Sequence, residues 1–149
     1  MTLQQRTDAT LATALRISVS RLARRLRVER LVPELPEPAL SDTQLAALAT
    51  LERHGAMTPG ELAEHEKVQP PSMTRVIAAL ADWDLVARAP DPTDRRQVIL
   101  SVTSRGRELV QQARRRREAW LARRLAELTP QERAALLAAA PVLEKLSQS

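Results

Sequence analysis

Apolar residues recur at spacings of three and four near the start of the chain, as they do along one face of a helix. The segment 32–40 then carries three prolines, which remove backbone donors and disfavour helical geometry in the preceding residues. We therefore expect a long amphipathic helix that ends before this segment. Its apolar stripe consists of Leu11, Leu15, Val19, Leu22 and Leu26.

Two further helices begin at recognisable capping patterns. Ser41 is followed three residues later by Gln44, and Thr58-Pro59 is followed by Glu61, so each pair can satisfy free N–H groups at a helix start. Gly55 supplies a left-handed stop for the first of the two. The buried side of that helix consists of Leu45, Leu48 and Leu51.

The second of these helices is short, because Pro70 and Pro71 follow closely and open another helix. A short helix, a tight turn and a second helix form the layout of a helix-turn-helix. The residues expected in the core of the second helix are Met73, Val76, Ile77 and Leu80.

Two strands, Leu85–Ala89 and Gln97–Val102, are expected to flank the turn 90–96 and form a hairpin. Three helices followed by a hairpin are the order of a winged helix-turn-helix. The fold class is therefore mainly α with a small β-hairpin wing.

The last third returns to a helical pattern. Thr103 is expected to cap an arginine-rich helix, and the Thr-Pro-x-Glu pattern at 129–132 begins a final helix that Pro141 should bend. The helices at the two ends carry more apolar surface than a small winged lobe can cover, which favours a dimer built from both ends. The expected interface residues are Leu11, Leu15, Leu22, Trp120, Leu136 and Leu143.

The 149 residues are expected to form a single domain, 1–149, with two functional parts. Residues 40–103 would form the DNA-binding lobe, whereas 8–31 and 104–149 would form the helical dimerisation region.

The charge pattern indicates an anionic partner that is contacted by a few placed residues. The net charge is +5, with arginine far more frequent than lysine, but the middle of the chain (41–104) has six basic and nine acidic residues, a net of −3. A protein that coats DNA without specificity would be basic throughout. Scarce aromatic residues also disfavour a binder of single strands.

Several other classes are disfavoured by composition. The chain has no cysteine, so it has no disulfide, thiolate metal site or thiol switch. It also lacks a membrane-spanning segment, a signal peptide and a glycine-rich phosphate loop, so we expect a cytoplasmic protein that is not an enzyme and uses no cofactor.

Two polar features favour ordinary surface roles over chemistry. His65 lies among glutamates on a helix, which is more typical of a solvated face than of a metal site, and His54 suits a helix C-terminus. The four arginines 114–117 point around most of a helix, so they cannot all reach one groove, and some are expected to pair with acids across the dimer.

Six residues are the candidates for contact with DNA. On the helix opened by the prolines, Ser72, Thr74 and Arg75 can reach base edges or phosphates. At the hairpin tip, Arg95 and Arg96 can enter a minor groove, where the negative potential favours guanidinium groups. Asp94 is expected to restrain one of them through an ion pair.

These motifs resemble the MarR family of bacterial winged-helix regulators. The strand-turn pattern of that family is met by Leu85-Val86, Arg88, Asp94-Arg95-Arg96, Val102-Thr103 and Gly106, and its recognition-helix pattern by 72–80. Two positions depart from it. Asp84 replaces a glycine, which costs little because aspartate tolerates left-handed geometry, and Pro70-Pro71 replaces small polar residues.

The resemblance implies a homodimeric, sequence-specific transcriptional regulator of double-stranded DNA, a repressor that binds a palindromic operator. It further implies release by a small anionic or phenolic effector that binds between the dimerisation helices and the lobe, through residues that the sequence does not identify. By the family pattern, Arg96 would be the arginine that enters the groove, and Arg95 is the alternative. Two alternatives remain open: a nonspecific architectural DNA-binding dimer, and an effector-binding or interaction module without DNA binding.

Overall fold

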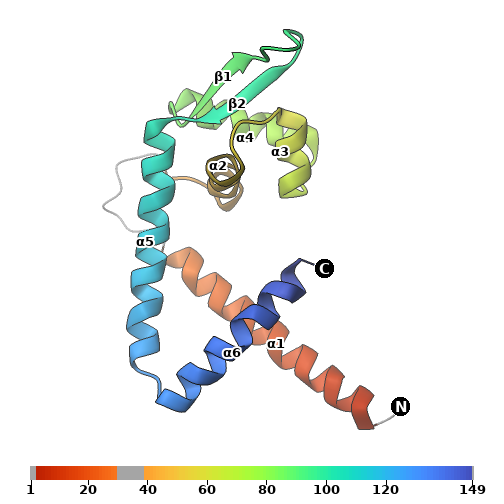
Figure 1. Cartoon of the computed structure of the whole chain (residues 1–149), viewed down its shortest axis with the longest axis vertical. Helices are drawn as coiled ribbons and strands as arrows, with labels where there is room; N and C mark the ends of the chain where they lie inside the picture. Colours follow the sequence, from red (N-terminus) through yellow and green to blue (C-terminus); the bar gives the residue numbers. More distant parts are fainter. Residues whose placement is uncertain (1–2, 30–38, 149) are drawn as a thin grey trace.

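The computed structural model describes residues 3–29 and 39–148, and it is mainly helical with one antiparallel hairpin, as predicted (Figure 1). Residues 30–38, which include most of the proline-rich segment, lie outside the described ranges. In chain order the elements are α1 (Leu3–Val28), α2 (Asp42–His54), α3 (Pro59–Glu66), α4 (Pro70–Asp82), β1 (Val86–Pro90), β2 (Val98–Val102), α5 (Ser104–Ala126) and α6 (Pro130–Ser147).

The capping residues at the helix starts are confirmed. Ser41 and Gln44 form a reciprocal capping box at α2, and Thr58 and Glu61 do the same at α3. At α6 the Thr129 N–H donates to Glu132 Oε2 at 2.8 Å, and the Glu132 N–H donates to Thr129 Oγ1 at 3.2 Å. Each cap stabilises its helix by about 1 kcal/mol, because it satisfies N–H groups that have no partner within the helix.

The hydrophobic core lies in the part of the molecule that runs from α2 to β2, which we call the winged lobe. Helix α2 packs against α3, α4, β2 and α5, and Val110 and Ala113 of α5 complete the core. Burying each large side chain stabilises the fold by roughly 1.5–3 kcal/mol. The fully buried large side chains are Leu48, Leu51, Leu62, Met73, Leu80, Leu85 and Leu100.

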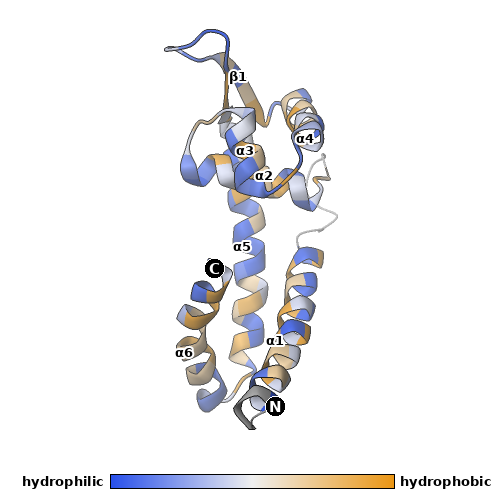
Figure 2. Ribbon diagram, turned by 90° about the vertical axis from the view of Figure 1, so that its right-hand side faces the viewer, coloured by the Kyte–Doolittle hydropathy of each residue, from blue (hydrophilic) through white to orange (hydrophobic). Residues whose placement is uncertain are grey.

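The two terminal helices, α1 and α6, are built differently. They flank the lower half of α5, the helix that descends from the winged lobe (Figure 2). Helix α6, which is described over its whole length, has no buried residue, and Leu137 is 78% exposed. The side chains of Leu11, Leu22, Leu136 and Leu143 are exposed as well.

Two of the expected interface residues are less accessible. Leu15 is half-buried, and Trp120 is only 8% exposed within a single chain. The guanidinium carbons of Arg25 and Arg124 lie 5.9 and 5.7 Å from the centre of the Trp120 ring, within range of a cation–π interaction. Trp120 therefore joins α5 to α1 of its own chain.

Both strands begin one residue later than expected, because the flanking residues make other hydrogen bonds. The Leu85 N–H donates to the Leu80 carbonyl at 2.9 Å and so completes the end of α4. The Gln97 N–H donates to the Asp94 carbonyl at 2.9 Å and so belongs to the turn. Helix α6 continues through Pro141.

Within residues 3–29 and 39–148, no helix combines the length and the apolar character that crossing a bilayer requires.

Candidate nucleic-acid interface

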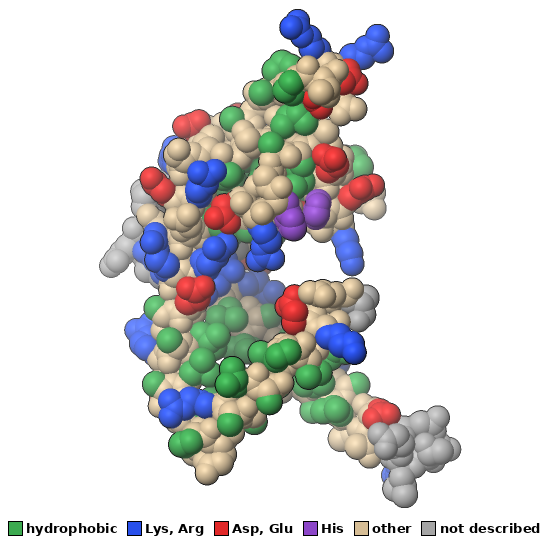
Figure 3. All heavy atoms as spheres, in the orientation of Figure 1, with side chains coloured by type: hydrophobic (Ala, Val, Ile, Leu, Met, Phe, Trp, Pro, Cys, Tyr) green, Lys and Arg blue, Asp and Glu red, His purple; other side chains and the backbone are tan. Residues whose placement is uncertain are grey.

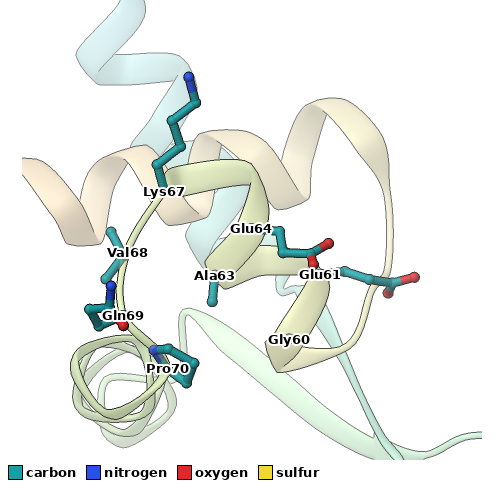
Figure 4. A pocket seen from close by; sticks show the side chains of 8 residues that line it. All are labelled: Gly60, Glu61, Ala63, Glu64, Lys67, Val68, Gln69 and Pro70. Carbon is teal, nitrogen blue, oxygen red and sulfur yellow. The ribbon is translucent and has the colours of Figure 1, made fainter.

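The turn between α3 and α4 is tight and sets the direction of α4. Lys67 ends α3 in the left-handed conformation, with φ 51°, and the Val68 N–H donates to the Ala63 carbonyl at 3.0 Å. Beside the turn is an open cleft of about 680 Å³, which Glu61, Glu64 and Lys67 line together with the start of α4 (Figure 4). Two carboxylates make this cleft a poor site for a phosphate group.

The outer face of α4 presents the predicted DNA-contacting residues. Met73, Ile77 and Leu80 are buried on the inner face, and Ser72 and Arg75 are exposed. Pro71 is also exposed, and it lies one helical turn before Arg75 on the side opposite the core.

Thr74 is exposed too, but its hydroxyl group is already used within the helix. It donates a hydrogen bond of 3.0 Å to the Pro70 carbonyl. The hydroxyl proton of Thr74 is therefore not available as a donor to another molecule, whereas its methyl group is free for apolar contact.

The start of α4 is unusually poor in hydrogen-bond donors. Pro70 and Pro71 occupy the first two helical positions, so neither has an N–H group to offer an anion. Gln69 precedes them, and its side chain makes no capping hydrogen bond within the part of the chain that the structure describes. Any contact made by this end of α4 is accordingly apolar, apart from the groups of Gln69 and Ser72.

The loop at the tip of the hairpin, residues 91–97, is held by its own hydrogen bonds. The Asp91 N–H donates to the Gln97 carbonyl at 2.9 Å, which closes the loop. Asp91 Oδ1 accepts from the N–H and from the hydroxyl of Thr93, each at 2.8 Å. These two hydrogen bonds from Thr93 hold the pKa of Asp91 below its ordinary value of 3.8.

Asp94 acts on the tip in a different way from the one expected. Its Oδ1 accepts a hydrogen bond of 3.1 Å from the backbone N–H of Arg96. Among the described residues, neither Arg95 nor Arg96 forms an ion pair with Asp94. The aspartate fixes the backbone, because a short side chain reaches the N–H two residues on, and both guanidinium groups stay exposed.

The base of the hairpin is locked to α4 and α5. Asp84 has φ 56°, so it takes the left-handed conformation expected for the residue that replaces a glycine. The Thr103 hydroxyl donates to the Asp84 carbonyl at 2.7 Å, and Thr103 Oγ1 accepts from the Gly106 N–H at 3.0 Å. A Cβ atom at Gly106 would lie 2.3 Å from the Leu85 carbonyl oxygen, so only glycine fits this approach.

Basic side chains extend from the outer end of the hairpin, the loop that contains Arg95 and Arg96 (Figure 3). The arginine run of α5 is placed elsewhere. Arg114 Nη2 lies 3.2 Å from Glu52 Oε2, so this ion pair joins α5 to α2 within one chain. Arg116 and Arg117 are partly buried.

A smaller cleft, of about 240 Å³, lies where α1, α2 and α5 meet. Arg27 and Arg117 line it together with Asp42, and its floor is formed by Leu45, Ala46 and Ala49. Arg27 Nε is 3.7 Å from Asp42 Oδ2. The sequence did not identify these residues, because they come from three helices that only the fold brings together.

The two histidines come together on the surface of the winged lobe. The rings of His54 and His65 stack, with their centres 4.8 Å apart and their planes at 30°. In the described ranges, no group of three or more His, Cys, Asp or Glu residues is arranged to hold a metal ion.

The fold thus brings the two halves of the predicted DNA site onto one lobe. Helix α4 packs directly against β1, so Arg75 and the arginine-tipped hairpin belong to one rigid unit. Sequence reasoning missed two residues that shape this site, Asp91 and Gln97. The Asp-Pro-Thr sequence at 91–93 was the available signal, since aspartate commonly accepts a hydrogen bond from a backbone N–H two residues on.

Comparison with known proteins agrees with this geometry. The model of the MarR family matches residues 40–98. The HTH-type transcriptional regulator MT0903.1 of Mycobacterium tuberculosis is 53% identical over 136 residues, which cover 91% of this chain and 92% of that protein. The HTH-type transcriptional repressor MdtR of Bacillus subtilis is 31% identical, with 93% and 87% covered.

Solved structures share the whole fold. The crystal structure of a transcriptional regulator protein from Pseudomonas aeruginosa PA01 has a TM-score of 0.84 and 34% identity, and the match covers 100% of this chain and 99% of that one. BpsR of Bordetella bronchiseptica has a TM-score of 0.64 and 25% identity, with 93% of each chain covered, and 6-hydroxynicotinic acid regulates its binding to DNA.

Both the winged lobe and the terminal helices therefore have counterparts in proteins of one group, which consists of regulators and not of enzymes. The chain belongs to the MarR family of DNA-binding transcriptional regulators.

Proposed function

We propose that the protein is a homodimeric, sequence-specific repressor that acts in the cytoplasm and binds a palindromic operator in double-stranded DNA. In each protomer, α4 enters a major groove and the hairpin tip enters the neighbouring minor groove. The half-sites lie about ten base pairs apart, from centre to centre.

The observation that carries this proposal is the pairing of an exposed Arg75 on α4 with a pre-formed, arginine-tipped hairpin on the same lobe. Arginine reads guanine through two hydrogen bonds in the major groove, and it is attracted by the potential of a narrow minor groove. The hydrogen bonds of Asp91 and Asp94 keep the loop ordered before DNA is bound, which reduces the entropy that binding costs.

The exposed apolar side chains of the terminal helices support the dimer. Leu11, Leu22, Leu136 and Leu143 would bury against the same residues of a second copy, and the very exposed Leu137 would join them. Two copies related by a two-fold axis would present two lobes to two half-sites. The half-buried Leu15 and the buried Trp120 would support the interface from behind.

The cleft between α1, α2 and α5 is the site that we propose for a small effector. Arg27 and Arg117 suit a carboxylate or phenolate oxygen, and Leu45, Ala46 and Ala49 suit an apolar ring. The control of BpsR by 6-hydroxynicotinic acid, an anion with a ring, supports an effector of this class. Because the cleft lies between α1, α5 and helix α2 of the lobe, a bound effector would alter the spacing of the two lobes.

The test is a selection of genomic DNA fragments by the purified protein, followed by competition titrations. We expect a two-fold symmetric consensus, with two chains bound to each site. Equal affinity for the selected site and for an unrelated duplex, with a steep dependence on salt, would instead favour a nonspecific architectural protein. Benzoate-type and hydroxynicotinate-type acids are then added, and those that fit the cleft should release the selected site.

Repression is tested separately, with a reporter gene placed behind the selected site. Removal of the protein should raise expression of the reporter. Lower expression after removal would indicate an activator.

A further inference from the structure

The outer face of α4 contains a small apolar patch that takes no part in the contacts proposed for Ser72 and Arg75. Pro71 is exposed and lies one helical turn before Arg75. Thr74 lies three residues after Pro71, so the two side chains are neighbours on the helix surface.

The hydrogen bonds of this segment determine what it can recognise. Pro71 has no N–H group, and the Thr74 hydroxyl donates to the Pro70 carbonyl at 3.0 Å. What these two residues offer to a groove is a pyrrolidine ring and a methyl group. With the Thr74 hydroxyl proton already used, neither side chain has a free donor for a phosphate oxygen, and the pyrrolidine ring cannot read the polar edge of a base.

The major groove has one apolar group that matches such a surface, the C5-methyl group of thymine. We propose that Pro71, with the methyl group of Thr74, packs against a thymine methyl group next to the base that Arg75 contacts. This inference rests on the proposed function, and it identifies one base of each half-site by its chemistry. The two prolines, which remove donors from the start of α4, thereby determine specificity at that base.

The same surface also disfavours cytosine at this position of the operator. A cytosine at this position presents an amino group and no methyl group, and burial of that amino group against a proline ring leaves a donor without a partner. Thymine is therefore preferred over cytosine for two reasons, the gained methyl contact and the avoided unsatisfied donor.

The experiment replaces thymine with uracil in the selected operator, one symmetric pair of positions at a time, because uracil lacks only the C5-methyl group. We expect one such position in each half-site to be sensitive. There, each replaced thymine should lower the affinity of the full-length dimer about fourfold, the factor that corresponds to burying one methyl group. Replacement in both half-sites should lower the affinity roughly fifteenfold.

A variant then assigns the effect to Pro71. Pro71→Ser should lose most of the difference between the thymine and uracil operators, because only the methyl group of Thr74 remains to contact the thymine. Pro130→Ser is the matched control, because Pro130 also occupies the first turn of a helix, at the exposed start of α6. It should keep the full difference between thymine and uracil.

The outcomes separate the inference from the function on which it rests. Equal affinity for thymine and uracil at every position, or a difference that is undiminished in Pro71→Ser, would overturn the inference and leave the repressor intact. Absence of any preferred duplex would overturn the proposed function itself. Equal affinity of the wild-type protein for thymine and uracil overturns the inference even where circular dichroism shows Pro71→Ser to be unfolded, and Pro71→Ala then makes the assignment in its place.

Discussion

The winged lobe and the terminal helices differ in how far their apolar side chains are buried within one chain. In the lobe, Leu48 is fully buried among α2, α3, α4 and the hairpin. In α6, Leu137 has similar chemistry and is 78% exposed. The lobe is stabilised within one chain, whereas the exposed leucines of the terminal helices would be removed from water only in the proposed dimer. In the proposed dimer, recognition and dimerisation would therefore belong to two regions that are stabilised in different ways.

The largest expected effect comes from the substitution of leucine by alanine, made once in the lobe and once in α6. Leu48→Ala should lower the free energy of unfolding by about 2–5 kcal/mol, because it leaves a cavity in a packed core. Leu137→Ala removes the same atoms from an exposed surface that only the second copy of the proposed dimer would cover. Its effect should therefore weaken the dependence of the unfolding midpoint on protein concentration. Chemical denaturation at two concentrations measures both, and equal behaviour of the two variants would refute the contrast.

Placing charge on the terminal helices should separate the protomers. Leu136→Glu combined with Leu143→Glu would bury unpaired carboxylates in the proposed interface, which is strongly unfavourable. We expect light scattering to report a monomer whose lobe keeps its structure by circular dichroism. Gln131→Glu, at an exposed polar position of the same helix, should stay dimeric. A double variant that remains a dimer would place the interface elsewhere.

Within the lobe, Arg75→Ala should weaken operator binding by about 1–3 kcal/mol and relax the preference at one base position. Both effects follow from the loss of a base contact, and a titration against operators with single base changes measures them. An unchanged preference at every position would show that Arg75 does not read a base.

The double replacement Arg95→Ala and Arg96→Ala should weaken binding to all operators by a similar factor and lower the salt dependence. Because Asp91 and Asp94 hold the loop through backbone groups, the fold should survive the loss of both guanidinium groups. A gel-shift titration with unchanged operator affinity would contradict the role proposed for the hairpin.

The smallest expected effect is on the pH dependence of stability. It can be measured at one helix cap in each region, the cap of α3 in the lobe and the cap of α6. Hydrogen bonds from the backbone and hydroxyl of Thr58 hold the pKa of Glu61 below 4.5, and those of Thr129 do the same for Glu132. Since both pKa values are lowered by folding, the stabilisation is present above pH 4.5 and is lost as the pH falls below it. Acid titrations of Glu61→Gln and Glu132→Gln should each show a shallower loss of stability than the wild type.

Local features of this fold were predictable, because their causes lie within a few residues. The capping pairs at 41–44, 58–61 and 129–132 and the left-handed Asp84 all follow from short patterns. The position of Trp120 was less predictable, because its burial depends on Arg25, which lies far away in the sequence.

In the candidate site, too, features with local causes were predictable and features that depend on distant residues were not. The arginines at 95 and 96 and the exposed Arg75 were identified from their spacing and context. The action of Asp94 was not, since a choice between a backbone N–H and a guanidinium group depends on the exact path of the loop. The cleft lined by Arg27, Asp42 and Arg117 depends on the packing of three helices, which no local pattern encodes.

The central claim is that two copies of this lobe read one symmetric site, each with α4 and the hairpin together. The test is to titrate the selected operator with the protein and to follow the complexes by analytical ultracentrifugation. An unrelated duplex is titrated in the same way at the same salt concentration. We expect two chains per operator and an affinity at least about a thousandfold above that for the unrelated duplex. One chain per operator, or equal affinity for the two duplexes, would contradict it.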